Sequence, residues 1–420
     1  MIYITIGIPA SGKSTSKKRM VAKLARKKRV LWLTPLRAEC KRLATDLIRM
    51  GLSYDDVKIV PSKPLSCPVL KRASIYDPII GIALCLVCKR KDGCEYKNFI
   101  REAIRSDKGV FIATHSFLWL TMFFDTVVID EFDYLIMSYA RIRSKEEVDT
   151  ILRAIEKVFG ESIARLVKEK YLVETEEGYI LSTAFPIRRF YTDNELHIVS
   201  ATMPNPDSDL FALSLGFSDL DELAEADASG EIKLDLRVLP EPKRMDRFFV
   251  DTRYRYWSSS LTRNGHLIVR KAVPRDVAEG KTVTVVARSK TECAMLYEML
   301  SRDLKVLAEG INWSKSNFDD WKRHRVRIIV VRGMFYRSLD IESDVVYAFF
   351  QHYRPNEIDR IYSKYPKVFH EYLHEFMEFD QHRAHIQTIF RCARVWGREH
   401  VFYLLDAKYR ETLRYFHHIA

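Results

Sequence analysis

The chain has 420 residues, of which 47% are hydrophobic and 30% are charged. This balance excludes a low-complexity or disordered chain and is enough for two or three compact units. The net charge of +12 favours a polyanionic partner such as nucleic acid, although a solvated basic surface would give the same total. No apolar run of about 18 residues and no cleavable leader is evident, so we expect a soluble, cytoplasmic protein without a membrane partner.

Nine short runs rich in Val and Ile recur along the chain, with helical segments between them. Runs of this kind are typical of buried parallel strands that helices cover on both faces. They span residues 3–6, 30–33, 110–113, 127–129, 197–200, 282–286, 326–331, 345–349 and 401–405. They form two clusters around a poorly patterned stretch near residues 205–245, which predicts α/β layers in two domains.

The first run leads directly into a complete phosphate-binding loop before a predicted helix. The loop consists of Gly7, Ile8, Pro9, Ala10, Ser11, Gly12, Lys13, Ser14 and Thr15. Its backbone N–H groups can surround phosphates, and the helix N-terminus adds positive potential. We expect Lys13 to reach the β and γ phosphates and Ser14 to bind Mg²⁺. The loop alone also resembles that of small P-loop kinases, including polynucleotide kinases, so the use of the triphosphate stays open.

Four of the seven cysteines lie close together in the next segment. They are Cys67, Cys85, Cys88 and Cys94, separated by 17, 2 and 5 residues. A disulfide scaffold is disfavoured inside a cell, whereas four thiolates can bind tetrahedral zinc or a [4Fe–4S] cluster. The spacing does not distinguish the two metals. Either one would hold together a small basic segment with few core residues.

The run at 127–129 ends in two adjacent acids, Asp130 and Glu131. Asp130 is placed to hold Mg²⁺ through its water shell, and Glu131 to orient the attacking water. An acidic turn after a core strand is common, but its pairing with Lys13 favours a triphosphate site. Downstream, Ser144 and Glu147 form a capping box that predicts the start of a helix through Phe159.

Asp130-Glu131-Phe132-Asp133 resembles the DExD box of superfamily 2 helicases. Other segments resemble further motifs in the order that this superfamily requires. They are 34–39 (motif Ia), 113–118, 200–204 (the Ser-Ala-Thr element), 282–289 (motif IV), 330–341 (motif V) and 387–394 (motif VI). Phe390 replaces the usual glycine of motif VI. The cysteines lie between motif Ia and the DExD strand, as in the iron–sulfur helicases, so the chain resembles a compact XPD/DinG-like helicase with a reduced arch.

This resemblance implies an ATP-dependent DNA helicase with two RecA-like domains in tandem and with ATP and Mg²⁺ as cofactors. It favours a [4Fe–4S] cluster over zinc and a monomeric motor that moves 5′ to 3′ on single-stranded or forked DNA, in a process such as DNA repair. Gln387, Arg391 and Arg394 would assist hydrolysis, because paired arginines on one helix face suit phosphate oxygens, and Asp340 would bind ATP. Contacts to the nucleic acid would come from Thr34, Arg37, Thr114, His115 and Arg288. ATP hydrolysis and strand binding would be coupled by Asp133, Ser200 and Thr202.

The motifs divide the chain into four predicted parts. Residues 1–59, 106–133 and 196–215 form the first motor domain, and residues 216–420 form the second. Residues 60–105 form the four-cysteine insert, and residues 134–195 a reduced, arch-like helical insert. Two rival functions remain: a P-loop nucleotide or polynucleotide kinase, and a regulatory DNA-binding module with weak ATPase activity.

Overall fold

The computed structural model describes residues 1–6, 13–61, 67, 78–88, 93–136, 143–174, 178–181, 194–238, 246–253, 259–333, 341–353, 358–359, 362, 372–392 and 398–415. The chain divides into two compact units. Unit 1 is built mainly from residues up to 239, and unit 2 mainly from residue 240 onward.

The main feature of unit 1 is a seven-stranded parallel sheet with the strand order β3-β4-β2-β5-β8-β1-β9. The strands are β1 (Ile2–Ile6), β2 (Arg29–Thr34), β3 (Val57–Ile59), β4 (Gly109–Thr114), β5 (Thr126–Asp130), β8 (Glu195–Ser200) and β9 (Leu234–Val238). The helices are α1 (Lys13–Leu24), α2 (Arg37–Arg49), α5 (Glu95–Arg105), η2 (His115–Phe123), α6 (Asp133–Ile136), α9 (Asp209–Leu215) and α10 (Leu220–Ala228).

Apolar side chains from both layers form the core of unit 1. Val21 and Ala25, from α1 and just beyond its end, and Leu43 from α2 pack against Trp32 and Val128 in the central strands. The interiors of β2, β4 and β5 are fully buried, which is why these strands consist of continuous apolar runs. Each of the five runs predicted in this part of the chain forms a strand.

Strand β9 places the boundary between the units later than expected. It pairs in parallel with β1, from Ile2 opposite Leu234 to Ile6 opposite Val238. The segment after residue 216 therefore completes the first sheet, whereas the motifs suggested a second domain that begins there. The sequence of β9 lacks a continuous apolar run because the side chains from Leu234 to Arg237 are partly or fully exposed.

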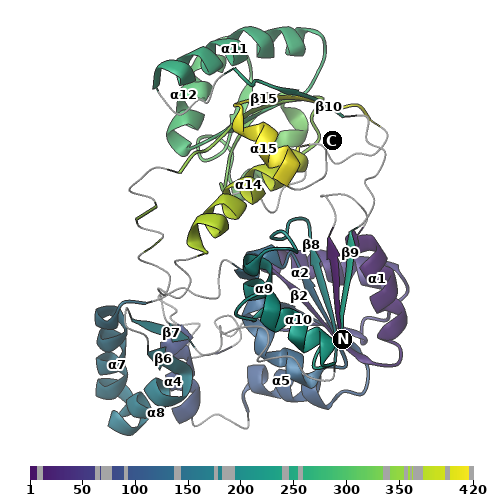
Figure 1. Ribbon diagram of the computed structural model, residues 1–420, viewed down its shortest axis with the longest axis vertical. Coiled ribbons are helices and arrows are strands. Elements are labelled where there is room, and N and C mark those ends of the chain that lie inside the picture. Colours follow the sequence, from purple (N-terminus) through teal and green to yellow (C-terminus); the bar gives the residue numbers. More distant parts are fainter. Residues whose placement is uncertain are drawn as a thin grey trace. The chain divides into compact units, whose positions relative to one another are not determined.

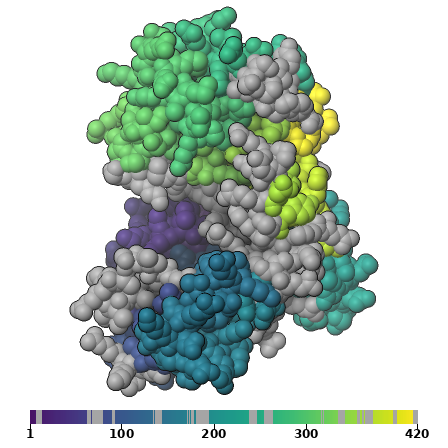
Figure 2. All heavy atoms as spheres, turned by 90° about the vertical axis from the view of Figure 1, so that its left-hand side faces the viewer, coloured from purple at the N-terminus to yellow at the C-terminus, as the bar shows by residue number. Residues whose placement is uncertain are grey.

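The two predicted inserts share one small hydrophobic core. Helix α4 (Pro78–Val87) contributes Ile79 and Ala83, and α7 (Lys145–Phe159) contributes Val148 and Ile155. Helix α8 (Glu161–Tyr171) and the antiparallel hairpin of β6 (Leu172–Glu174) and β7 (Tyr179–Leu181) complete the group. Figure 1 shows these elements gathered together, and in Figure 2 the atoms of α7 and α8, coloured blue, form one continuous surface.

Unit 2 contains a six-stranded parallel sheet with the order β10-β15-β14-β11-β13-β12. Its strands are β10 (Arg247–Val250), β11 (Val283–Ala287), β12 (Val306–Ala308), β13 (Val326–Val330), β14 (Val345–Phe349) and β15 (Val401–Leu405). Its helices are α11 (Ser259–Ala278), α12 (Lys290–Leu300), η5 (Lys315–Arg323), α14 (Leu373–Arg391) and α15 (Lys408–Tyr415). The four remaining predicted runs are β11, β13, β14 and β15. No helix within the described residues has both the length and the apolar character of a membrane span.

Candidate functional site

The residues predicted to bind nucleotide lie at the carboxyl edge of the unit 1 sheet. Strands β5, β8 and β1 are neighbours there. The register pairs Ile6, the last residue of β1, with Ser200, and pairs Asp130 with Val199. Open α/β sheets bind ligands at this edge because loops and helix N-termini converge on it. Three motifs far apart in the sequence are thus brought together.

Lys13 is the first residue of α1, and its side chain is buried. Ser14 and Thr15 follow in the first turn, where unpaired backbone N–H groups and the helix dipole favour an anion. The six other predicted loop residues, Gly7, Ile8, Pro9, Ala10, Ser11 and Gly12, lie outside the described residues. The start of the helix is therefore where the sequence predicts phosphate binding.

Asp130 ends β5 and is partly buried. Burial raises its pKa to about 6, and the charge of Glu131 adds to the rise, whereas the Lys13 and Lys18 ammonium groups oppose it. A divalent cation would favour the ionised carboxylate. The donors available at this edge are the Ser14 hydroxyl and the Asp130 carboxylate, and such oxygen ligands are those that Mg²⁺ prefers.

Glu131 has a strained backbone, with φ of 53°. A left-handed conformation costs a residue other than glycine about 1–3 kcal/mol and often marks a functional site. The turn is held on both sides, because His115 Nε2 lies 2.8 Å from the Asp130 carbonyl oxygen and the Phe132 N–H donates to the Val199 carbonyl at 3.2 Å. The strain thus fixes the direction in which the Glu131 side chain leaves the strand.

The three predicted coupling residues form one buried hydrogen-bonded group. Ser200 Oγ lies 2.9 Å from Asp133 Oδ1 and 2.8 Å from the Thr202 carbonyl oxygen. All three side chains are buried. The group ties the start of α6 to the segment that follows β8, so a change at the acidic turn can be passed to the Ser-Ala-Thr element.

The candidates for nucleic-acid contact in unit 1 differ in accessibility. Thr34 and Thr114 are register partners at the ends of β2 and β4. The Thr34 hydroxyl is buried and donates to the Leu36 carbonyl at 3.1 Å, whereas Thr114 is partly exposed and its Oγ1 lies 2.8 Å from Ser116 Oγ. Arg37 is partly exposed and donates to the Val60 carbonyl at 3.0 Å. The buried His115, bonded to the Asp130 carbonyl, supports the acidic turn.

In unit 2, the predicted motif VI lies at the end of α14. Gln387 and Arg391 are both buried, and Arg391 is the last residue of the helix. Arg394 and Asp340 lie outside the described residues. Phe390, which stands where the resembled motif has glycine, packs against both Phe248 and Phe402, with ring centroids 6.1 and 6.0 Å away. The aromatic side chain therefore anchors this helix to the sheet.

Arg288 follows β11 and is held by a neighbouring carboxylate. Its guanidinium donates to Glu292, with Nε 3.0 Å and Nη2 2.5 Å from Oε1. Glu292 also lies 2.8 Å from His266 Nε2. A nucleic-acid phosphate would compete with Glu292 for Arg288.

The four clustered cysteines form no disulfide bonds. Cys85 lies in the last turn of α4, Cys88 follows that helix directly, and Cys94 is the N-cap residue of α5. Cys67 is buried. Three of the four thiols therefore flank the short connection between two helices. Among the described side chains, however, no three of these sulfur atoms lie within 4.8 Å of one another, so the four-cysteine metal site stays a prediction.

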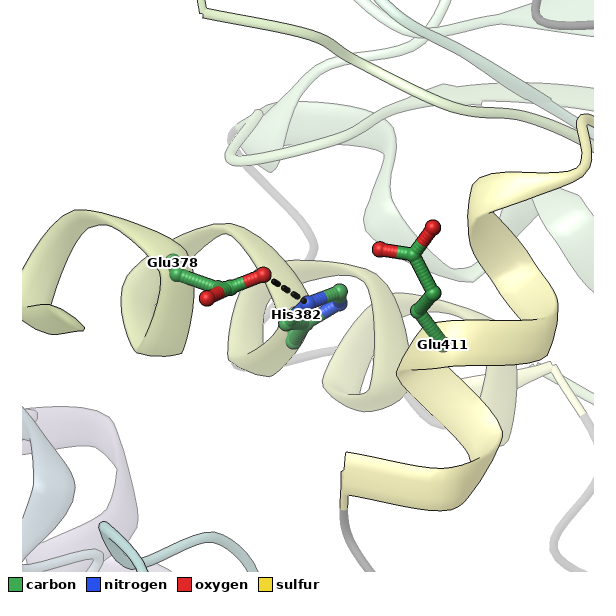
Figure 3. A group of neighbouring side chains, drawn as sticks. All are labelled: Glu378, His382 and Glu411. Carbon is green, nitrogen blue, oxygen red and sulfur yellow. Dashed lines mark ion pairs between the residues drawn. The ribbon is translucent and has the colours of Figure 1, made fainter. Parts of the chain in front are cut away.

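Among the described residues, one group of His and carboxylate side chains meets the distance requirement for a metal site. Its members are Glu378, His382 and Glu411, shown in Figure 3, with ligand atoms within 4.8 Å of one another. The Lys408 ammonium ion-pairs with Glu411 and lies 3.0 Å from Glu378, so a cation already joins the two carboxylates. The group explains how α14 is attached to α15 without any metal.

The sequence did not reveal a second buried ionic group on α14. Asp380 accepts hydrogen bonds from Arg332, Tyr353 and Arg383, each at 2.5 Å. The residues of this ionic group come from three separate segments of the chain, so no local sequence motif indicates the group. The only available signal was the spacing of Asp380 and Arg383 on the helix face that also carries Gln387 and Arg391.

No protein family model matches this sequence, and no curated protein does. Solved structures do match it over nearly its full length. The structure of S. tokodaii Xpd4 aligns with a TM-score of 0.56 and 13% identity, covering 100% of this chain and 94% of that one. A structure named XPD helicase aligns with a TM-score of 0.54 and 13% identity, covering 99% and 95%. This likeness confirms the predicted fold class, two RecA-like parallel-sheet domains in tandem.

Proposed function

We propose that this chain is an ATP-driven motor that moves along single-stranded nucleic acid and separates duplexes. The observation that carries the proposal is the buried contact between Asp133, Ser200 and Thr202. A nucleotide or polynucleotide kinase has no need to connect its acidic turn to the end of the next strand. A motor needs that connection, because hydrolysis must change how the protein holds the nucleic acid.

In the proposed reaction, the residues of unit 1 bind and activate the triphosphate. Lys13 and the N-terminus of α1 hold its phosphates, Ser14 and Asp130 hold Mg²⁺, and Glu131 orients the attacking water. The metal neutralises charge on the phosphate oxygens. The left-handed backbone conformation of Glu131 supports this role, since strained residues concentrate at sites where a side chain must keep a fixed direction.

Unit 2 is proposed to supply the cationic groups that speed hydrolysis. Gln387 and Arg391 lie four residues apart on α14 and therefore share one helix face. The planar guanidinium of Arg391 can pair with two phosphate oxygens at once. Arg394 and Asp340 are proposed to act in the same reaction on the strength of the motif resemblance alone.

We propose that the nucleic acid is DNA and that the protein moves along it in the 5′ to 3′ direction, since XPD/DinG-like helicases act on DNA with that polarity. Thr114, Arg37 and Arg288 are the partly exposed residues among the proposed contacts, whereas Thr34 and His115 are buried. Forked duplexes with either a 5′ or a 3′ single-stranded tail test the polarity. Unwinding that requires a 3′ tail would contradict it.

Cys67, Cys85, Cys88 and Cys94 are proposed to hold a [4Fe–4S] cluster, with zinc as the alternative. Either group, when bound, supplies a cross-link that fixes the connection between α4 and α5. Iron and zinc analysis of protein purified without oxygen separates the two, because only the cluster gives a brown colour and contains iron and sulfide.

The motor proposal is tested by steady-state ATPase assays with and without single-stranded DNA. The wild type should be stimulated by DNA. Lys13→Ala and Glu131→Gln should each lower kcat by at least about 10²-fold, and Arg391→Ala by about 10³-fold or more, as electrostatic and arginine-finger groups usually do. Arg398→Ala is the matched control, because Arg398 pairs with Asp344, which directly precedes β14.

Two results would decide against the motor. ATPase activity indifferent to nucleic acid, combined with phosphoryl transfer to a nucleotide or a DNA end, would favour the kinase. Binding of DNA with wild-type turnover retained in Arg391→Ala would favour the regulatory module.

A further inference from the structure

The turn that follows β13 contains a strained arginine. Arg332 has φ of 57°, and Glu131 is the one other residue besides glycine in the described part of the chain with a positive φ. A left-handed arginine persists only where surrounding contacts hold it. Arg332 lies within the predicted motif V, so the second strained residue also falls in a motif.

Three contacts hold the Arg332 guanidinium. Nη2 donates to Asp380 Oδ2 and to the Tyr353 hydroxyl, both at 2.5 Å, and the group lies over the Tyr353 ring, 4.8 Å from its centroid. The Tyr353 hydroxyl donates in turn to Asp380 Oδ2. The other carboxylate oxygen, Oδ1, accepts from Arg383 at 2.5 Å. One carboxylate therefore joins the turn after β13, the segment that follows β14, and helix α14.

Asp380 is 4% exposed, so its charge depends on these partners. Burial alone would raise its pKa, but the Arg332 and Arg383 guanidinium groups outweigh burial and hold the pKa well below its usual range. The carboxylate stays ionised across the physiological range. A shared carboxylate between two arginines is a directional link, since each guanidinium must keep its orientation to donate.

The opposite side of the turn is fixed by Glu309. Its Oε2 accepts the Val330 N–H at 2.8 Å, and a Cβ added at Gly333 would overlap the Glu309 carboxylate and lie 2.7 Å from the Val330 carbonyl oxygen. Glycine is therefore required after Arg332. The turn is confined between the end of β12 and helix α14.

The far end of motif V is attached to the same helix. The Ile341 N–H donates to the Arg391 carbonyl at 2.8 Å, and the Ser343 N–H donates to the Cys392 carbonyl at 3.1 Å. Residues 334–340 lie outside the described residues. Motif V is thus joined to α14 at its beginning, through Asp380, and at its end, through Arg391.

Asp380 also shares a helix face with the proposed catalytic residues. Arg383, Gln387 and Arg391 follow it by three, seven and eleven residues, and these spacings fall on one stripe of an α-helix. A shift of motif V transmitted through Arg332 therefore acts on the side of the helix that bears Gln387 and Arg391.

We propose that Asp380, with Arg332 and Tyr353, is a positioning group that makes motif V and motif VI move as one body during ATP hydrolysis. The inference rests on the proposed function, because it assigns a role in turnover to this group. Asp380 does not touch the triphosphate. It sets the orientation of the helix that carries Arg391.

The test compares Asp380→Asn, Arg332→Gln and the milder Tyr353→Phe with the wild type. Each should lower the DNA-stimulated kcat, by about 10-fold for the first two and about threefold for the third, with KM for ATP within about twofold. The double variant Arg332→Gln/Asp380→Asn should be no slower than the worse single variant, because residues acting as one unit are not additive. Arg332→Lys, which keeps the charge, should recover part of the rate.

Tyr347→Phe is the matched control. The Tyr347 hydroxyl donates to Asp276 Oδ2 at 2.7 Å in the same unit, on β14 but away from motif V. Its loss should affect thermal stability about as Tyr353→Phe does and leave kcat unchanged. Equal kcat for the two Tyr→Phe variants, or additive effects in the double variant, would overturn the positioning role. If the wild type lacks DNA-stimulated ATPase, the proposed function fails instead, so the two failures are distinguishable.

Discussion

Phe390 shows how a departure from the motif that this segment resembles can be accommodated by packing. The ring occupies the position of a glycine and packs against Phe248 and Phe402, which are themselves stacked 4.7 Å apart. The sequence alone left open how closely this helix could approach the sheet. The aromatic group answers that question, because β10 and β15 present rings of matching size.

We predict that Phe390→Ala lowers the free energy of unfolding by about 3–5 kcal/mol, the usual cost of removing a buried Phe side chain. Urea unfolding followed by circular dichroism measures the change. Phe249→Ala is the control, because Phe249 is 48% exposed on edge strand β10 and should cost much less. Equal losses for the two variants would mean that Phe390 is not an anchor.

His197 is a titratable residue buried in the middle of the first sheet. Its ring stacks on Tyr3, with centroids 4.7 Å apart, and its Nδ1 accepts from the Lys17 ammonium at 3.2 Å. Burial, the Lys17 and Arg237 charges and the N-terminal amine together lower its pKa to about 3. The folded protein therefore keeps this imidazole neutral far below its ordinary pKa of 6.5.

This depressed pKa predicts acid sensitivity. Below pH 6.5 the unfolded chain binds a proton that the folded chain rejects, so stability falls as the pH decreases toward 3. One such group can account for up to about 2.5 kcal/mol between pH 6.5 and 4.5. His197→Gln should lose less stability over this range than the wild type, as measured by urea unfolding at both pH values. Substitution of the partly exposed His324 should leave the wild-type difference in place, and an unchanged difference in His197→Gln would contradict the assignment.

At the scale of elements, α4 connects the cysteine segment to the helical insert. Its residues Ile79 and Ala83 pack in one core with Val148 and Ile155 of α7, while Cys85 and Cys88 lie at its carboxyl end. A metal bound by these cysteines would restrain α4. Through the shared core, it would also restrain α7 and α8.

We therefore predict that Cys88→Ser increases hydrogen exchange in α7 and α8 as well as in α4. Mass spectrometry of the full chain measures the exchange of each segment. Cys293→Ser, at a buried thiol in unit 2, is the control and should leave these helices unaffected. If exchange in α7 and α8 is the same in both variants, the metal does not stabilise the helical insert.

The elements that could be predicted are those whose pattern is local. All nine Val/Ile runs form strands, because burial on both faces imposes a continuous apolar sequence, and Ser144 caps α7 by accepting the Glu147 N–H at 3.1 Å. Edge strands were missed: β10 alternates between exposed and partly buried residues and lacks such a run. The joint core of α4 and α7 depends on contacts between segments more than 60 residues apart, which no local pattern encodes.

The residues of the candidate site likewise divide into those that local motifs predict and those that depend on contacts between distant segments. Because parallel strands end at one edge, Asp130 and Ser200 could be placed near Lys13 from their motifs alone. The group of Arg332, Tyr353 and Asp380 could not, since its members lie on three elements and none belongs to a recognised pair. The direction in which a side chain points could not be predicted from the sequence either, as the buried Thr34 hydroxyl illustrates.

For the whole molecule, the two units contribute different groups to the proposed reaction. Unit 1 holds Lys13, Asp130 and Glu131, and unit 2 holds Gln387 and Arg391. The proposed reaction uses both sets of residues, so we expect a variant in either unit to lower turnover and a bound nucleic-acid strand to raise it. The net charge of +12 favours binding of the nucleic acid. Each phosphate that a Lys or Arg neutralises releases counterions, and this release strengthens binding.

We predict that binding of single-stranded DNA weakens steeply with salt. If the basic side chains neutralise about five phosphates, a plot of the logarithm of the binding constant against that of the salt concentration has a slope of about −3.5. Raising the salt from 50 to 200 mM should then weaken binding about 100-fold. Fluorescence anisotropy with a labelled oligonucleotide, with ATP absent, measures this dependence. Arg37→Ala should make the slope shallower by about 0.7 if Arg37 contacts a phosphate, whereas Arg165→Ala, an exposed control on α8 paired with Glu161, should leave it unchanged. An affinity independent of salt would mean that the excess charge serves only as a solvated surface, and the nucleic-acid track would then have to be sought among uncharged side chains.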